Sequence, residues 1–585
     1  MWGAAAVPVS VTMALLLCAA LLATAVSGHI SHDYRPLVAT REGRVKGVMD
    51  RSAGGHLFYC FKGVPYAQPP LRQLRFQAPQ RHSGWRGIRD AIDHGSKCSQ
   101  FDHLKNFTRV GEEDCLFANV YSRQLPKREG SLTGLPVLVL IHGGGFFFGS
   151  GDADEYGPHY FMDEPVVLVT FNYRLGAFGF FSTHDAAAPG NYGLLDQVVL
   201  LHWVQDNIAN FGGDPKSVTI LGQASGGSSV SLQVLSPLTR DLFHHAISQS
   251  GMSLSTFAAR DTRKGAEKKL SDQLGCTKPS GKISVKCIRS VSSLNLMNAL
   301  EAIGEGNMPG FPPRVDRESP YPFLPDEPRA ILESGKFNIV PWMAGMTSME
   351  GSFFLPIRLQ TEQFVEGVLR KAVSHWAPFI GLYGESEYSI LDCGASVINE
   401  TSKVVNFYAP TSGNATIETL ATALSDRFYV NEISAEIDLA SAHAPLYKYV
   451  LDHTGPGRLI NNIALPSPSN LPWPVPELGV SHGDDLRYLF STDNLPRERP
   501  GSPGYAMIRF MVNLWVNFAR TGHPKSDILL MPEWPIFTEQ HQRHMRLNSQ
   551  PAVGERLFEE RVNFWKTVAV NEAWRHPVVK TVDGC

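Results

Sequence analysis

The sequence has no excess of charge of either sign. Its 585 residues include 53 lysines and arginines against 56 aspartates and glutamates, a formal net charge of −3 with both signs interspersed. Nucleic acids and anionic membrane surfaces attract proteins through clustered positive charge. The composition therefore argues against both kinds of binding, and we expect no nucleic-acid partner.

The sequence also lacks low-complexity tracts, charge blocks and internal repeats, the features that would mark a linker. At this length, with 43% hydrophobic residues, the chain can bury a large core. We therefore predict one large domain over residues 29–570, followed by a short polar tail over residues 571–585.

Long apolar runs are absent after residue 28, where no segment approaches the roughly 20 residues needed to cross a bilayer. The apolar run at 11–28 ends in small residues and is followed by polar sequence. This pattern predicts a signal peptide over residues 1–28. A retained membrane anchor is the alternative, since no Lys or Arg precedes the run. The polar end KTVDGC argues against a GPI signal, so we expect a secreted, extracellular protein without a membrane span.

A secreted context gives the cysteines a meaning. Of the eight cysteines, Cys18 falls within the predicted signal peptide, so an odd number remains and at least one thiol is left over. Local pairs that could each close a short loop are Cys98 with Cys115, and Cys276 with Cys287.

The pairing of the remaining cysteines is not determined by the sequence. Cys60 and Cys393 could pair with each other, or stay reduced in apolar surroundings. Cys585 is expected to be either a free or capped thiol or the link in a disulfide-bonded homodimer. Sequons that fit a glycosylated extracellular surface stand at Asn106, Asn399 and Asn414.

Strand-like and helical patterns alternate from residue 136 onward. Continuous apolar runs predict buried strands at 136–141, 166–174 and 218–222, and a further strand is expected at 447–453. Helical spacing predicts helices at 193–211, from about Gly226, and at 504–520. Apolar strands that alternate with helices predict an α/β fold with a large, mainly parallel central sheet flanked by helices.

Several ordered motifs carry a family resemblance: FKGVPYAQPPLRQLRF, EEDCLFANVYS, NYRLGAFGFF, GNYGLLDQVVLLHWVQDNIANFGGDPKSVTILG and WVNFARTGHP. In these motifs the chain resembles the type-B carboxylesterases, a family of α/β-hydrolase fold that includes cholinesterases and juvenile hormone esterases. The match runs from REGRVKG to RVNFW and covers nearly the whole chain. The resemblance implies an α/β-hydrolase fold, no cofactor and no metal, and disulfides within both local cysteine pairs.

The resemblance also implies roles for individual residues. HGGGF (142–146) matches the loop whose backbone N–H groups form the oxyanion hole, with Gly144 and Gly145 as donors and the N–H of Ser225 as the third. GVSHGDDLRYLF makes His482 the general base, and AGMTSMEGSFF makes Glu350 the acid that orients it. Ser250 matches a serine with a supporting role.

The stretch VTILGQASGGSSV (218–230) departs from the family at its centre. A strand, sharp turn and helix with Gly-x-Ser-x-Gly form a nucleophile elbow. Here the family's nucleophile position falls on Ala224, and a serine follows one residue later at Ser225. Relative to the family, two neighbouring residues are exchanged.

Ser225 is expected to contribute its N–H and not its hydroxyl, because successive side chains at a helix start are rotated by roughly 100°. A misplacement of about 1 Å can cost about 100-fold in rate, and in subtilisin loss of the serine costs about 2 × 10⁶ in turnover. We therefore predict a catalytically inactive site. The alternatives are a rescued Ser225, a residual water-mediated activity or a misread elbow codon.

Two function classes follow from the resemblance. The first is a secreted, non-catalytic protein that binds a lipophilic ester-like ligand or an extracellular protein partner, as in the adhesion proteins that share this fold. The second is an active serine carboxylesterase that hydrolyses lipophilic esters. In this class the chain is similar to juvenile hormone esterases, because the glutamine at position 223 resembles the residue found there in their elbow. The loop between Cys98 and Cys115 contains no tryptophan, so the choline-binding aromatic of cholinesterases has no counterpart.

Overall fold

The computed structural model describes residues 35–102, 107–127, 134–258, 265–304, 310–359, 362–380, 394–410, 414–455, 478–493 and 496–568. The predicted signal peptide and polar tail lie outside these residues, as do Asn106, Cys393 and Cys585. The expected boundaries of the domain and the tail therefore stay predictions.

Eleven of the described strands form one sheet, in the order β16-β15-β14-β13-β12-β11-β9-β10-β8-β4-β3. In chain order these are β3 (Val48–Arg51), β4 (Leu57–Pro65), β8 (Phe117–Ser122), β9 (Leu135–Ile141), β10 (Val167–Phe171), β11 (Gly213–Gln223), β12 (His245–Gln249), β13 (Trp342–Thr347), β14 (Leu446–Leu451), β15 (Arg543–Leu547) and β16 (Ala552–Glu555). The strands from β10 across to β15 are parallel, and antiparallel strands lie at both ends of the sheet. The predicted α/β architecture is confirmed.

The central strands are buried on both faces, which explains their continuous apolar sequences. Every residue of β9 and β10 is buried. Alternate side chains of β9 enter two different hydrophobic clusters, Val137 and Val139 on one face and Leu138 and Leu140 on the other. A parallel sheet covered on both faces requires this pattern, because successive side chains of a strand point to opposite sides.

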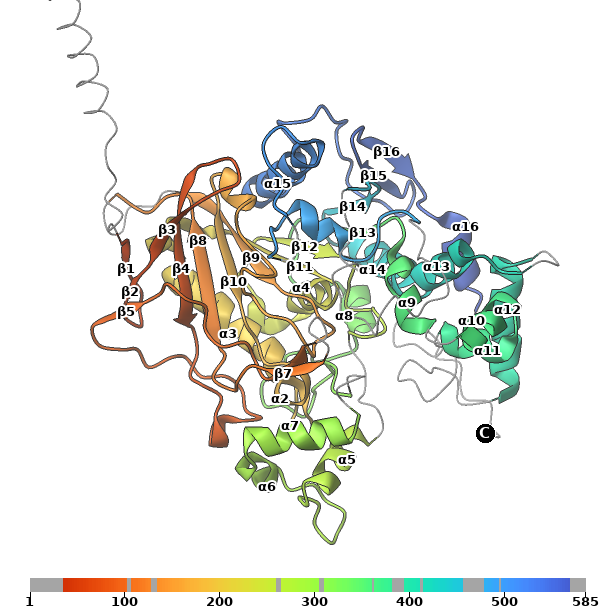
Figure 1. Ribbon diagram of the computed structural model, residues 1–585, viewed down its shortest axis with the longest axis horizontal. Helices are drawn as coiled ribbons and strands as arrows, with labels where there is room; N and C mark the ends of the chain where they lie inside the picture. Colours follow the sequence, from red (N-terminus) through yellow and green to blue (C-terminus); the bar gives the residue numbers. More distant parts are fainter. Residues whose placement is uncertain are drawn as a thin grey trace, which may run out of the picture.

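Helices cover the two faces. The helix α15 (Pro503–Thr521) packs on the face of Leu138 and Leu140, whereas α4 (Ser225–Leu235) packs against β9, β11 and β12 on the other face, beside α3 (Tyr192–Asn207). Figure 1 shows α15 above the sheet and α3 and α4 below it. Three predicted helices are therefore confirmed, and α15 begins and ends where Ser502 and Gly522 cap it.

The remaining helices and small sheets surround this core. The helices are α2 (Gly176–Phe180), α5 (Ala266–Gln273), α6 (Val285–Ser290), α7 (Ser293–Ala302), α8 (Pro328–Ser334), α9 (Leu355–Arg358), α10 (Glu362–Leu369), α11 (Val373–Phe379), α12 (Gly394–Tyr408), α13 (Ile417–Ser425), α14 (Asn431–Ser441) and α16 (Glu559–Trp565). One small sheet joins β1 (Leu37–Ala39), β2 (Arg44–Lys46) and β5 (Ile88–Asp90), and a second joins β6 (Gln100–Asp102) and β7 (Thr108–Val110). Among the helices of the described ranges, none is long and apolar enough to cross a membrane.

Both local cysteine pairs form disulfides, as the resemblance implied. Cys98 is bonded to Cys115 with Cα atoms 4.9 Å apart, and Cys276 is bonded to Cys287 with Cα atoms 5.5 Å apart. Cys60 is buried in β4 and forms no disulfide within the described residues. Burial raises the pKa of its thiol, so Cys60 stays protonated and inert.

Candidate active site

The carboxyl ends of the parallel strands meet at one edge of the sheet, and the candidate residues lie just beyond them. The glycine loop follows β9, Ala224 follows β11, Ser250 follows β12, and Glu350 follows β13. Ligands of open α/β sheets bind at this edge, because loops from several strands converge there. The topology therefore gathers residues that are far apart in the sequence.

Ala224 forms a sharp turn between β11 and α4. Its backbone has φ 55° and ψ −124°, a conformation that L-residues rarely adopt and that costs of order 1–3 kcal/mol. Two glycines make the turn possible. A Cβ on Gly222 would lie 2.3 Å from the carbonyl carbon of Gly226, and one on Gly226 would lie 2.1 Å from the oxygen of Ile141. The strand and the helix can approach this closely only without those side chains.

Ser225 is fully buried as the first residue of α4. Its hydroxyl oxygen accepts a hydrogen bond from the N–H of Phe146 at 3.3 Å. The hydroxyl therefore binds the far end of the glycine loop. The N–H of Ser225 belongs to the first turn of α4, where backbone donors have no partner within the helix.

The glycine loop lies directly against this turn. A Cβ on Gly143 would lie 3.6 Å from the methyl carbon of Ala224. Gly144 and Gly145 have φ of +107° and +64°, and a Cβ on either would clash, with the oxygen of Phe148 at 2.0 Å or the ring of Phe147 at 2.3 Å. Within the described residues, the N–H groups of Gly144 and Gly145 donate no hydrogen bond. These two groups are free to bind an acceptor.

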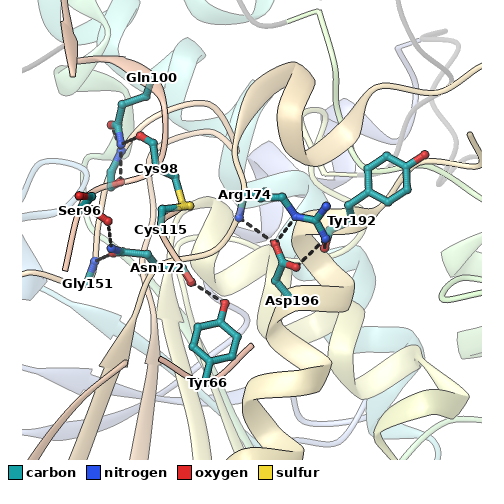
Figure 2. Close-up of a disulfide and its surroundings, with 11 residues drawn as sticks. Tyr66, Ser96, Cys98, Gln100, Cys115, Gly151, Asn172, Arg174, Tyr192 and Asp196 are labelled. Atoms are coloured by element: carbon teal, nitrogen blue, oxygen red, sulfur yellow. Dashed lines mark hydrogen bonds and ion pairs between the residues drawn. A yellow bond between two sulfur atoms is a disulfide. The ribbon is translucent and has the colours of Figure 1, made fainter. Parts of the chain in front are cut away.

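A polar network near the Cys98–Cys115 disulfide holds Gly149, three residues after the glycine loop (Figure 2). The amide nitrogen of Gln100 donates to the oxygens of Cys98 and Gly149, each at 2.9 Å. Its amide oxygen accepts from the N–H of Gly149 at 2.7 Å. The side chain of Gln100 thereby joins the disulfide to the segment that follows the glycine loop.

The segment after β10 supports Phe146, the last residue of the loop. Arg174 forms a buried, two-pronged ion pair with Asp196 of α3, with Nε–Oδ2 and Nη2–Oδ1 distances of 2.8 and 2.7 Å (Figure 2). Two residues later, the N–H of Gly176 donates to the oxygen of Phe146 at 2.8 Å. This ion pair fixes the segment on which Phe146 rests.

His482 and Glu350 are hydrogen-bonded, with Nδ1 of the imidazole 2.6 Å from Oε2 of the carboxylate. Glu350 begins the 3₁₀ helix η6 (Glu350–Phe353) and is fully buried. Its other oxygen accepts from the hydroxyl of Ser250 at 2.6 Å and from the N–H of Thr347 at 2.7 Å. An ionised carboxylate accepts all three bonds, so it orients the imidazole with a proton on Nδ1.

The second imidazole nitrogen meets a residue whose role the sequence did not reveal. Nε2 of His482 lies 3.1 Å from the side-chain nitrogen of Gln223, the last residue of β11. The only available signal was that Gln223 immediately precedes the elbow's central residue.

Three aromatic rings pack around the imidazole of His482. The ring centroid of Tyr429, from the π-helix η7 (Asp426–Val430), lies 4.7 Å from that of the imidazole, and the ring of Phe353 lies at 5.4 Å. The ring of Phe354 lies at 6.1 Å. An apolar surface therefore borders the polar groups, the composition typical of sites for lipophilic ligands with one polar function.

A further buried acid lies three residues after His482. Asp485, in the 3₁₀ helix η10 (Asp484–Tyr488), accepts from the side-chain nitrogen of Gln249 at 2.6 Å. Burial, together with the nearby charge of Glu350, raises the pKa of Asp485 to about 7. Asp485 is part of the motif GVSHGDDLRYLF, but the sequence alone did not indicate that its carboxyl group would be buried beside the site.

The predicted glycosylation sites can be compared with the structure only in part. Asn399 and Asn414 are exposed, as a glycosylation acceptor must be, whereas Asn106 lies outside the described residues. No group of three His, Cys, Asp or Glu side chains in the part of the chain that the structure describes is arranged to hold a metal ion.

Comparison with known proteins shows that the sequence is similar to those of carboxylesterases. The sequence profile of the carboxylesterase family matches residues 34–565. The chain is 34% identical to a juvenile hormone esterase of Tribolium castaneum, over 84% of each chain. It is 32% identical to liver carboxylesterase 1 of Oryctolagus cuniculus, over 96% of this chain and 98% of the relative. It is 30% identical to an acylcarnitine hydrolase of Mus musculus, over 93% of each.

Proposed function

This chain belongs to the carboxylesterase family, and we propose that it binds a lipophilic ester without hydrolysing it at an enzymatic rate. Ala224 then occupies the position of the family's nucleophile. The observation that carries the proposal is a methyl side chain at the sharp turn between β11 and α4, where φ is 55° and ψ is −124°. Acyl transfer needs a side-chain oxygen or sulfur at that point, and a methyl group supplies neither.

The neighbouring serine supports the same conclusion. The Ser225 hydroxyl is fully buried and accepts from the N–H of Phe146 at 3.3 Å. A nucleophile must instead lie within about 3–3.5 Å of the carbonyl carbon that it attacks. We therefore assign Ser225 to the support of the glycine loop.

The retained groups define the ligand that the site suits. The free N–H groups of Gly144 and Gly145 can donate to a carbonyl oxygen. The rings of Phe353, Phe354 and Tyr429 around His482 offer an apolar contact surface. An uncharged ester with a lipophilic body meets both requirements, and this class is favoured over a protein partner.

A second candidate function is active ester hydrolysis with Ser225 as nucleophile. It is favoured by the names of the relatives, which are esterases and hydrolases. The buried, hydrogen-bonded hydroxyl of Ser225 weighs against it. The two candidates differ in one measurable property, the turnover of a simple ester.

The test compares p-nitrophenyl acetate hydrolysis by the full-length wild type, Ala224→Ser, Ser225→Ala, and the double variant Ala224→Ser with Ser225→Ala. We expect the wild type to match the buffer rate and both serine variants to hydrolyse the ester, with His482→Asn abolishing the gain. Loss of a triad serine costs up to about 10⁶-fold, so the gain should span orders of magnitude. Wild-type turnover that disappears in Ser225→Ala would instead establish the second candidate.

Secretion is part of the proposal. It is supported by the apolar run at 11–28, by the two disulfides and by the exposed sequons at Asn399 and Asn414. We expect protein from the medium of expressing cells to begin near residue 29 and to lose mass on deglycosylation. Non-reducing electrophoresis of the same material tests the link through Cys585, since a dimer band that survives Cys585→Ser excludes it.

A further inference from the structure

We propose that Gln223 is a positioning residue that holds His482 as a neutral imidazole with its proton on Nδ1, by donating a hydrogen bond to Nε2. In this arrangement the hydrogen bond from Gln223 uses the lone pair of Nε2, the atom at which the imidazole would otherwise accept a proton from a nucleophile. The inference extends the proposed function, because it says how a site without a serine hydroxyl keeps its histidine ordered.

The amide nitrogen of Gln223 and Nε2 of His482 face each other, and only one of them can accept a hydrogen bond. The side-chain nitrogen of Gln223 lies 3.1 Å from Nε2 of His482, and both residues are buried. A carboxamide nitrogen carries two hydrogens and accepts no hydrogen bond. The imidazole nitrogen must therefore be the acceptor, which requires that Nε2 carry no proton.

The other side of the ring gives the same result. Nδ1 lies 2.6 Å from Oε2 of Glu350. The Glu350 carboxylate already accepts two hydrogen bonds on its other oxygen, from Ser250 and Thr347. It is therefore an acceptor toward the ring, and Nδ1 carries the proton. The two contacts together define one tautomer.

The orientation of the amide is the point on which the proposal depends. If the oxygen of Gln223 faced the ring instead, Nε2 would need a proton, and the imidazole would become a cation held by two acceptors. The oxygen faces the glycine loop, since a Cβ on Gly143 would lie 3.4 Å from it. The two orientations predict opposite protonation of a single atom.

Three aromatic side chains also lie against the ring of His482. Phe353, Phe354 and Tyr429 present their rings to the imidazole. The acidic groups in this region are Glu350, Asp484 and Asp485. Gln223 is thus the neutral donor that the geometry directs at Nε2.

The test is ¹⁵N NMR of the full-length protein labelled at histidine, with the His482 signals identified by their loss in His482→Asn. At neutral pH we expect Nδ1 protonated and Nε2 unprotonated in the wild type. Gln223→Met keeps the side-chain volume and removes the donor, so only the Nε2 resonance should move, toward that of an acceptor without a partner. Gln223→Glu replaces the donor with an acceptor, so a proton should appear on Nε2.

A matched control separates this effect from general disturbance of the core. Gln233 of α4 is also buried and donates to the backbone oxygen of Leu194 and the side-chain oxygen of Gln197. Gln233→Met should leave both imidazole resonances unchanged. A protonated Nε2 in the wild type, or the same Nε2 resonance in wild type and Gln223→Met, would overturn the proposal. Should Gln223→Met fail to fold, the wild-type tautomer and Gln223→Glu still decide it.

This outcome is independent of the proposed function. Ester turnover by the wild type would refute the loss of catalysis, whatever the tautomer of His482. A protonated Nε2 in a protein without turnover would refute only the role of Gln223.

Discussion

The hydroxyl oxygen of Ser225 accepts a hydrogen bond from the backbone N–H of Phe146 at 3.3 Å, and the whole side chain is buried. One residue earlier, Ala224 forms the strained turn that ends β11. The two residues therefore have different parts in the turn between β11 and α4. Ala224 keeps the backbone geometry, and Ser225 uses its hydroxyl to hold the glycine loop.

Ser225→Ala should lower the free energy of unfolding by about 1–3 kcal/mol, because the N–H of Phe146 would be left buried without its partner. Ser228 provides the matched control. It lies on the same helix, and its buried hydroxyl has no hydrogen-bond partner within the described residues. Ser228→Ala should be nearly neutral in urea denaturation. Equal effects of the two substitutions would contradict the role of Ser225.

Ala224→Gly should stabilise the protein by about 1 kcal/mol. Alanine at φ 55° and ψ −124° is strained, and the strain outweighs the extra freedom that glycine has in the unfolded chain. Ala299 lies inside α7, where glycine is unfavourable. Ala299→Gly should therefore destabilise by about 1 kcal/mol or more. Denaturation curves of both variants check the prediction, and a loss of stability in Ala224→Gly would refute the strain at the turn.

The two disulfides should differ in their effect on the site. By loop entropy, removing either pair with Cys→Ser substitutions costs about 3 kcal/mol of stability. The Cys98–Cys115 disulfide is joined through Gln100 to Gly149, in the segment that directly follows the glycine loop. We expect its removal to weaken binding of an uncleaved p-nitrophenyl ester, measured by equilibrium dialysis.

Removal of the Cys276–Cys287 disulfide should leave that affinity unchanged, because it ties α6, which contains Cys287, to the segment after α5. If both double variants lose affinity equally, the link between the first disulfide and the glycine loop has no functional effect.

Asp485 should make the protein less stable as the pH rises. Its pKa is raised to about 7 in the folded protein against 3.8 for an ordinary aspartate, so the folded state holds the proton more tightly than the unfolded chain does. The stability that this provides is complete below about pH 4 and is lost between about pH 4 and 7. Asp485→Asn cannot ionise, so its free energy of unfolding should fall less steeply over that range. Parallel profiles would contradict the prediction.

Much of the fold followed from the sequence for a physical reason. The strands β9, β10 and β11 are buried on both faces, and such strands must be continuously apolar, which makes them visible. The edge strands β3 and β16 are partly exposed and carry mixed sequences, so their pairing depends on contacts far along the chain. No local pattern could have located them.

The site divides in the same way. The glycine loop, His482 and Glu350 could be located from the sequence, because each lies within a motif that resembles the family's. Gln223 and Asp485 acquire their roles only when β11, β12 and the segment after β14 meet at one edge of the sheet. Contacts between residues more than 200 positions apart cannot be derived from spacing in one sequence.

Covalent labelling tests the central claim most directly. The full-length protein and Ala224→Ser are treated with an organophosphate ester, and the adduct is located by mass spectrometry of peptides. We predict no adduct on residues 218–230 of the wild type, and one phosphoryl group on the introduced serine of Ala224→Ser. An adduct on Ser225 of the wild type, accompanied by ester turnover, would contradict the account.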